Sequence, residues 1–211
     1  HNELKYVSIV DEALRNNTWF TFYNYGEAYA DKPPLYFWLM MLSRLISGDY
    51  YMWIFGLFSV VPALGIMVVM DRWCRMDNVK HNAIISNLML GTTIMFIGST
   101  VVLRMDMLMT FFIVLSLYTF FKLYKGVGKP RDRWLLPVWI FLALFSKGPM
   151  GIIIPLLSIT VFLLTRKKIR DFGKYMGLKQ WGILVGLCLL WFTGIYLEGG
   201  WEYLNNILFK Q

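Results

Sequence analysis

Three short stretches of the sequence place charged side chains directly against apolar residues. Asp31 and Lys32 precede two prolines and an apolar run; Arg104 and Asp106 interrupt VVLRMDMLM; and Lys147 lies in FSKGPMG. Charges at the edge of a bilayer are costly, so they usually pair, face a cavity or serve function. Lysine and arginine can bind phosphate and stabilise a phosphate leaving group, while carboxylates can hold a metal or remove a proton. This set predicts a site for an anionic head group.

The composition predicts that these residues belong to a membrane protein. Of the 211 residues, 57% are hydrophobic, 18% aromatic and only 16% charged, whereas soluble domains carry about 25% charge. Four to six windows approach the roughly 18 apolar residues of a spanning helix. These windows are 52–70, 82–103, 107–121, 134–146, 149–165 and 181–197.

The net charge of +8 does not indicate a nucleic-acid partner, because the basic residues lie in short loops between apolar windows. Their positions instead indicate which loops face the cytoplasm. By the positive-inside rule, the basic stretches 71–81, 122–133 and 165–179 should be cytoplasmic. Two apolar windows separate consecutive basic stretches, so the hairpin tips at 103–106 and 146–149 should both lie outside. This parity places Asp31 on the same external side.

The sequence before the first window predicts interfacial elements. A helix over residues 33–48 reaches roughly 24 Å, less than the ~30 Å hydrocarbon core, so we expect it to lie in the external interface; a short tilted span is the alternative. Residues 4–14 have the spacing of an amphipathic surface helix, and residues 19–29 predict a short hairpin or ordered loop.

The predicted organisation is an external loop over 1–51, a helical bundle over 52–197 and the start of a further external segment over 198–211. We also expect at least one helix upstream of the sequence, because no signal peptide is visible. Cys74 and Cys188 are the only cysteines, and their settings predict two unpaired structural thiols.

A purely structural interpretation of the charged stretches stays open. Arg104 and Asp106 are compatible with a helix-end pair, and Asp106 with a residue that favours the following helix through its dipole. Lys147, before Gly148 and Pro149, is compatible with an ordinary turn and a snorkelling lysine. Convergence of three separate loops on one membrane face favours a functional site over three unrelated structural features.

Four motifs resemble a known family. They are NELKYVSIVDEAL from Asn2, DKPPLYFWL from Asp31, RMDML from Arg104 and SKGPMGIIIP from Ser146. In this order and spacing they resemble the polyprenyl-phosphate-dependent glycosyltransferases, which include lipid A aminoarabinose transferases and protein O-mannosyltransferases. The resemblance implies an all-α integral membrane enzyme of the C-type glycosyltransferase fold, a polytopic helical bundle with interfacial helices in its first external loop.

The same resemblance implies a polyprenyl-phosphate-linked sugar donor, inverting transfer, and a lipid, glycan or protein acceptor. It also implies a bacterial inner membrane with the site on the periplasmic face. Lys5 and Lys32 take the family's basic positions, and Asp31 is the acid before Lys-Pro-Pro, which makes it a weak candidate ligand for a divalent cation. The family's acidic pair falls on Asn2 and Glu3.

Asn2 departs from the family pattern, because an amide cannot accept a proton at neutral pH. Either Glu3 has taken over, or the acceptor is an ionised phosphate that needs no base. In the leading hypothesis, Glu3 orients or deprotonates the acceptor. Asp31 and Asp106 position the cations or a metal. The donor phosphate is bound by Lys32, Arg104 and Lys147.

Two other classes remain as alternatives. A lipid flippase or small-molecule transporter should carry polar residues and broken helices near the middle of the bilayer; Asn87 and several Ser and Thr residues give this class some room. A structural membrane subunit should carry repeated Gly-xxx-Gly interfaces, of which Gly182 and Gly186 are the main instance.

Overall fold

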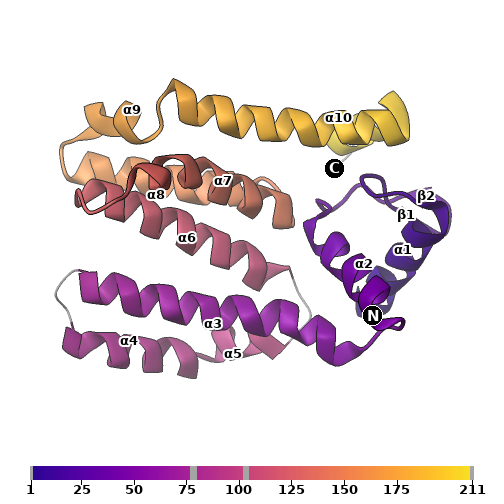
Figure 1. The fold of residues 1–211 in the computed structure, drawn as a ribbon, viewed down its shortest axis with the longest axis horizontal. Helices are drawn as coiled ribbons and strands as arrows, with labels where there is room; N and C mark the ends of the chain where they lie inside the picture. The colour runs from indigo at the N-terminus through magenta and orange to yellow at the C-terminus, as the bar shows by residue number, and fades with distance from the viewer. Residues whose placement is uncertain (1, 77–79, 102–104, 210–211) are drawn as a thin grey trace. The chain divides into compact units, whose positions relative to one another are not determined.

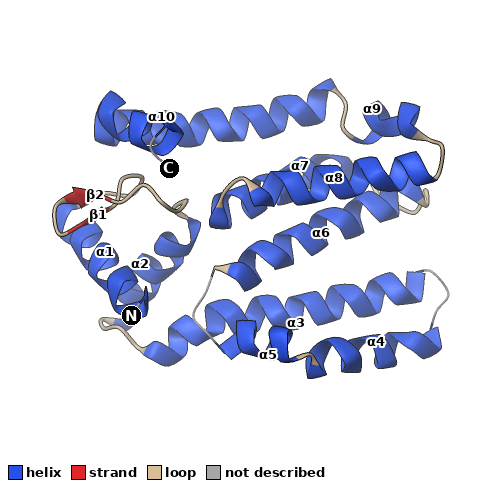
Figure 2. Ribbon diagram, turned by 180° about the vertical axis from the view of Figure 1, so that it is seen from behind, coloured by secondary structure: helices blue, strands red, loops and turns tan. Residues whose placement is uncertain are grey.

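The computed structural model describes residues 2–76, 80–101 and 105–209. The chain forms two compact units. Unit 1 comprises residues 1–55 and 185–211, and unit 2 comprises residues 56–184, so the boundaries fall within helices α3 (Met52–Met76) and α10 (Leu178–Phe209). Nearly all regular structure is helical (Figures 1 and 2), as the sequence predicts.

Unit 1 begins with two helices joined by a hairpin. Helix α1 (Asn2–Asn16) buries its apolar stripe at Ile9, Val10 and Ala13, and it packs against α2 (Leu35–Ser47). The antiparallel strands β1 (Tyr23–Asn24) and β2 (Glu27–Ala28) lie between them. This confirms the predicted amphipathic helix and hairpin.

The hairpin turn has a specific local cause. Tyr25 and Gly26 both have positive φ, 56° and 79°, as a two-residue type I′ turn requires. Their backbone N–H groups donate to the Glu12 carboxylate at 2.9 and 3.0 Å. Glu12 on α1 therefore holds the turn and ties the hairpin to the helix.

Helix α2 is too short to span a bilayer. Its 13 residues reach roughly 20 Å, and Gly48 ends it in the left-handed conformation at φ 75°. One face buries Tyr36, Phe37, Met40, Met41 and Ser43. The opposite face exposes Leu42, Leu45 and Ile46. A buried face opposite an exposed apolar face is what an interfacial helix needs.

Unit 2 is built on helices whose apolar faces pack together. Helices α6 (Asp106–Tyr124), α7 (Pro130–Lys147) and α8 (Met150–Thr165) lie side by side (Figure 1). Ala63 and Ile66 of α3 form a buried cluster with Met107 of α6. The basic stretch after α8 forms a 3-10 turn (Ile169–Asp171) and the short helix α9 (Phe172–Tyr175).

Three helices among the described residues are long and apolar enough to cross a membrane: α3, α6 and α10. These helices are consistent with the integral membrane protein that the composition predicts. The windows 134–146 and 149–165 do form helices, α7 and α8, but neither meets the same length and hydropathy test. Helix α8 has 16 residues, roughly 24 Å.

The window 82–103 does not form one continuous helix. It contains α4 (Lys80–Thr92) and α5 (Ile94–Val101), which bend by 68° where they meet. At the break, the hydroxyls of Thr92 and Thr93 donate to the carbonyls of Leu88 and Met89, both at 2.8 Å. Threonine hydroxyls that bond back to the preceding turn bend helices. The window 82–103 therefore forms a bent pair of helices, which passes the length and hydropathy test when the two helices are taken together.

Candidate functional site

The segment before α2 presents Asp31 and Lys32 from a fixed backbone. Pro33 and Pro34 are buried, and the carbonyl of Pro34 accepts the N–H of Trp38 at 2.9 Å in the first turn of α2. The fixed φ of proline suits a helix start. Asp31 is exposed and Lys32 half-buried, and Lys32 has no ion-pair partner among the described residues. No carboxylate in the described part of the chain therefore neutralises its ammonium group.

Lys5 of α1 lies close to this segment. Its Nζ lies 4.4 Å from the centre of the Tyr29 ring, a cation–π distance, and Tyr29 is two residues before Asp31. Burial, followed by the charges of Tyr6, Asp31 and Tyr203, raises the pKa of Tyr29 above its ordinary value. Tyr29 therefore stays a neutral phenol between a basic and an acidic predicted site residue.

In unit 2 the structure brings two predicted site residues into contact. Asp106, the first residue of α6, forms an ion pair with Nζ of Lys147, the last residue of α7. Both side chains are about one-third exposed. The Asp106 carboxylate is also stabilised by the positive end of the α6 dipole, because it lies at the N-terminus of that helix. The predicted meeting of the two hairpin tips is confirmed for these residues.

The Lys-Gly-Pro motif explains how Lys147 reaches this place. Gly148 has φ 115° and ψ −157°, a conformation that a residue with a side chain rarely adopts. Pro149 then starts α8. A Cβ on Gly151 would lie 2.2 Å from the backbone carbon of Ala143, so only glycine lets α7 and α8 approach this closely. The motif is a tight turn that delivers Lys147 to the start of α6.

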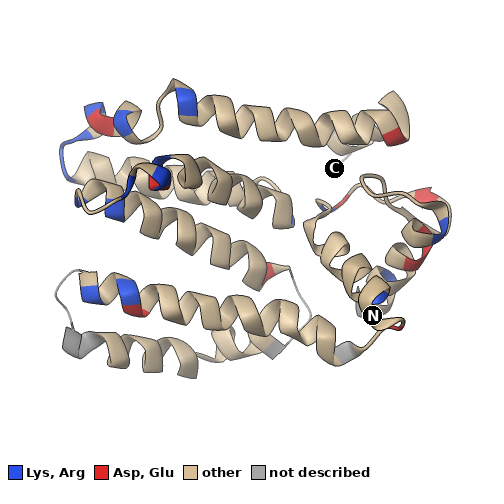
Figure 3. Cartoon of the chain, in the orientation of Figure 1, with Lys and Arg blue, Asp and Glu red and all other residues tan. Residues whose placement is uncertain are grey.

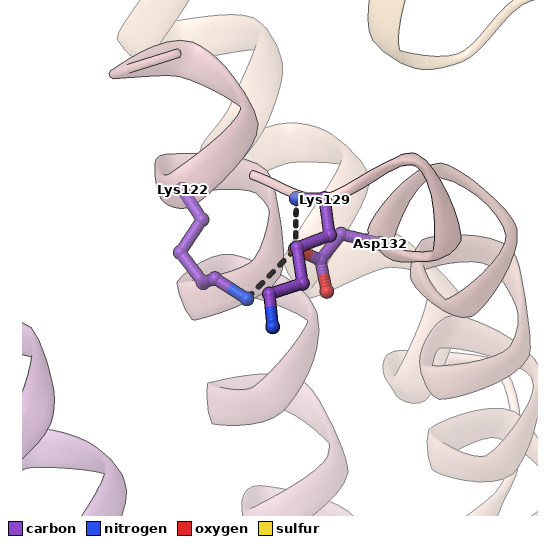
Figure 4. A network of polar contacts seen from close by, with 3 residues as sticks. All are labelled: Lys122, Lys129 and Asp132. Atoms are coloured by element: carbon purple, nitrogen blue, oxygen red, sulfur yellow. Dashed lines mark hydrogen bonds and ion pairs between the residues drawn. The ribbon is translucent and has the colours of Figure 1, made fainter. Parts of the chain in front are cut away.

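A second ion pair lies at the other end of α6. Lys122 Nζ and the backbone N–H of Lys129 both donate to Oδ2 of Asp132 at 2.7 Å (Figure 4). Asp132 has an exposed fraction of 4% and lies in the first turn of α7, before the apolar window. The two pairs are roughly 24 Å apart along α6. In unit 2 the Lys and Arg positions gather at the Asp132 end (Figure 3), as the three basic stretches predict.

Sequence reasoning missed a carboxylate in unit 1. Glu198 of α10 accepts hydrogen bonds from three consecutive backbone N–H groups, those of Trp19, Phe20 and Thr21, at 2.6, 2.5 and 2.8 Å. Five residues later on α10, the Tyr203 hydroxyl accepts the N–H of Phe22 at 2.9 Å. It also lies 2.8 Å from the carbonyl of Tyr29, to which it donates. Helix α10 thereby fixes the loop that leads to Asp31.

Glycines let α10 approach this loop. A Cβ on Gly194 would lie 2.7 Å from the Phe20 ring, and one on Gly199 would lie 2.5 Å from Cγ2 of Thr21. Gly200, at φ 68°, kinks the helix immediately afterwards. The only sequence signal for this contact was an acid followed by two glycines at the end of an apolar window.

The remaining predicted residues are placed as follows. Arg104 lies outside the described residues, and Glu3 is described only as part of the α1 backbone. Within the described residues, no three His, Cys, Asp or Glu side chains lie together as a metal site would require. Asp31 therefore has no set of partner ligands among them, and no step is assigned to a metal. Cys74 and Cys188 are free thiols, as predicted.

A family model described as dolichyl-phosphate-mannose-protein mannosyltransferase matches residues 31–192. This range covers Asp31, Lys32 and the Asp106–Lys147 pair. The chain belongs to this family. An uncharacterized protein of Aquifex aeolicus (strain VF5) is 28% identical over 97% of the chain, which spans 40% of that protein.

Two solved structures show the same fold. The chain resembles ArnT of Cupriavidus metallidurans bound to undecaprenyl phosphate, with a TM-score of 0.81 and 19% identity over 97% of the chain and 38% of that protein. The apo state of the same protein gives a TM-score of 0.77 at 19% identity, over 98% of the chain and 39% of ArnT. The chain thus has the predicted C-type glycosyltransferase fold and spans about two-fifths of its relatives.

Proposed function

We propose that the protein containing this chain transfers one sugar from a polyprenyl-phosphate carrier to a lipid, glycan or protein acceptor on the external face of the membrane. The Asp106–Lys147 pair carries this proposal. It places a lysine at the end of apolar helices, within the matched range of a lipid-phosphate glycosyltransferase family. The solved relative that holds undecaprenyl phosphate supports a polyprenyl-phosphate donor.

The reaction is an inverting displacement. The acceptor oxygen attacks the anomeric carbon, the bond from that carbon to the phosphate oxygen breaks, and the polyprenyl phosphate leaves with the electron pair. Lys5, Lys32, Arg104 and Lys147 would bind the phosphate, whose negative charge grows as the bond breaks. Asp106 would hold Lys147, and Asp31 would orient the neighbouring cations.

The acceptor proton has two possible fates. When the acceptor is a hydroxyl group, Glu3 would take its proton. When the acceptor is an ionised phosphate, no proton has to be removed. The second case would explain why Asn2 stands where the family carries an acid.

Replacement of Lys32 tests the proposal directly. Because Lys32 has no protein counter-ion among the described residues, Lys32→Ala should remove a phosphate contact without leaving a buried charge unpaired. We expect transfer to fall on the order of a hundredfold or more, the usual cost of removing one group that stabilises developing charge. The assay measures polyprenyl phosphate released from a labelled donor by the intact, purified protein.

The matched control is Lys167→Ala, which removes an exposed lysine from the basic stretch after α8. It should keep normal turnover. Near-normal turnover by the Lys32→Ala variant, with the same unfolding temperature as its parent, would count against this role of Lys32.

The bend between α4 and α5 favours a second candidate function, a lipid flippase or transporter. A broken helix within an apolar window is a feature that transporters use. The same assay separates the two classes. A transporter would move the labelled lipid-linked sugar across a vesicle membrane without releasing its lipid phosphate.

A further inference from the structure

A basic cavity lies in unit 2 at the end opposite the Asp106–Lys147 pair. It forms where the α6–α7 loop, α9 and the first turn of α10 meet, and its volume is about 510 Å³. This volume falls in the range typical of small-molecule sites. Ten residues line it: Leu123, Gly126, Gly128, Lys129, Pro130, Arg133, Trp134, Lys174, Lys179 and Gln180. The lining therefore carries four cationic side chains and no acid.

These four cations have no protein counter-ion among the described residues. The buried carboxylate of Asp132, next in sequence to the lining residue Arg133, is already bound by Lys122 and by the Lys129 backbone. Lys174 has only a weak ring contact, with its Nζ 6.0 Å from the centre of the Tyr175 ring. Like charges around one cavity repel each other. A bound anion would offset this repulsion.

Two tryptophans indicate that the cavity lies at the membrane–water interface. Trp134 lines it with an exposed fraction of 53%, and Trp181, next to the lining residue Gln180, has an exposed fraction of 38%. Partly exposed tryptophans at helix ends are typical of the membrane–water interface. Both lie within the first five residues of their helices, α7 and α10. The cavity thus combines phosphate-binding cations with side chains that suit the head-group layer.

We propose that this cavity binds the phosphate of an anionic glycerophospholipid from the leaflet that contacts the basic loops. Basic pockets between membrane helices are known to bind anionic lipid head groups. Arginine and lysine supply the charge-assisted hydrogen bonds that a phosphate accepts. The cavity is separate from the Asp106–Lys147 pair and does not depend on the proposed function, because the cavity and the pair lie at opposite ends of α6.

The test compares two triple variants of the intact protein in detergent. The cavity variant is Arg133→Gln, Lys174→Gln and Lys179→Gln. The control is Arg131→Gln, Lys167→Gln and Arg170→Gln, which removes the same charge from exposed residues of the same basic stretches that do not line the cavity. Native mass spectrometry measures the binding of phosphatidylglycerol, of zwitterionic phosphatidylcholine, and of phosphatidylglycerol in competition with inorganic phosphate.

We expect the parent protein to retain phosphatidylglycerol in preference to phosphatidylcholine. Each Lys or Arg near a lipid phosphate contributes roughly fivefold, so the cavity variant should bind on the order of a hundredfold more weakly, and the control should stay close to the parent. Equal losses in both variants would show a general charge effect and overturn the proposal. Full displacement of the lipid by dilute inorganic phosphate would also overturn it, in favour of a soluble anion.

Circular dichroism and the unfolding temperature check that the cavity variant is folded. A second variant, Trp134→Ala, keeps every charge and removes the interfacial side chain. It should weaken phosphatidylglycerol binding while leaving the affinity for inorganic phosphate unchanged. An unchanged lipid affinity in this variant would contradict a head group bound at membrane depth.

Discussion

Asp106 and Lys147, 41 residues apart in the sequence, form an ion pair that joins the first residue of α6 to the last residue of α7. Both side chains are about one-third exposed, so the pair contributes little to stability: exposed pairs give about 0–1 kcal/mol. A pair of small structural value at the end of apolar helices is better explained by function.

The first prediction separates the contribution of this ion pair to stability from its contribution to sugar transfer. Asp106→Asn should lower the free energy of unfolding by less than about 1 kcal/mol, yet reduce sugar transfer at least tenfold, because Lys147 loses the group that positions it. The measurements are unfolding temperature and release of polyprenyl phosphate. Asp71→Asn, which removes the exposed Asp71–Arg75 pair, is the control. A large stability loss without an effect on transfer would assign the pair to folding alone.

The second prediction concerns the Glu198 carboxylate. Glu198→Gln removes its charge and should weaken all three hydrogen bonds from residues 19–21, with a stability loss of about 1–3 kcal/mol. Hydrogen exchange at the amides of Trp19, Phe20 and Thr21 should become faster. Glu202→Gln on the same helix removes an exposed acid and should leave these rates as they are. Unchanged rates in both variants would show that Glu198 does not hold the loop.

The third prediction tests the contact between α7 and α8. Gly151→Ala places a Cβ against the Ala143 backbone, so the helices must separate, with a cost of about 1–3 kcal/mol and a displaced Lys147. Transfer and unfolding temperature should both fall. Gly182→Ala is the control, because its Cβ meets open space and alanine in a helix stabilises by roughly 0.5–1 kcal/mol. An unaffected Gly151→Ala variant would mean that the close approach is not needed.

The fourth prediction is a pH dependence at Asp132. Burial raises the pKa of this carboxyl, but the hydrogen bonds from Lys122 and from the Lys129 N–H, with the charges of Lys122 and Arg131, outweigh burial and hold the pKa below its ordinary value. A lowered folded-state pKa gives stability that is present above the unfolded value, about 3.9, and is lost as pH falls below it.

Asp132→Asn should therefore be less stable than the parent at neutral pH, by about 1–3 kcal/mol. The difference should shrink as the pH drops towards 3. Chemical unfolding of both proteins across this range measures it, with Asp171→Asn in the neighbouring basic stretch as the control. If the difference in unfolding free energy between the two proteins does not change with pH, the ion pair is not its cause.

The placement of Asp106 and Lys147 on one face could be predicted, because it depends on counting the apolar windows between the basic stretches. Their ion pair could not, because counting tells which helix ends share a face and not which side chains meet. The fold and family could be predicted for a different reason, since the Asp-Lys-Pro-Pro and Lys-Gly-Pro motifs resemble those of a known family.

The bend at Thr93 and the contacts of Glu198 could not be predicted. Hydropathy runs without interruption from residue 82 to 103, whereas the bend depends on where two threonine hydroxyls find their acceptors. Glu198 meets its partners only through the three-dimensional path of the chain. The external position of residues 1–51 stays a prediction. So do the roles of all seven candidate site residues: Glu3, Lys5, Asp31, Lys32, Arg104, Asp106 and Lys147.

The bonds from residues 19–21 to Glu198 also set an order of events during synthesis. Trp19 and its acceptor are 179 residues apart, and ribosomes add roughly 5–20 residues each second. For roughly ten to forty seconds after Trp19 emerges, the three amides have no carboxylate to bind and must stay in water or find other partners. Residues 19–21 can therefore reach their final form only after helices α3 to α9 have been made.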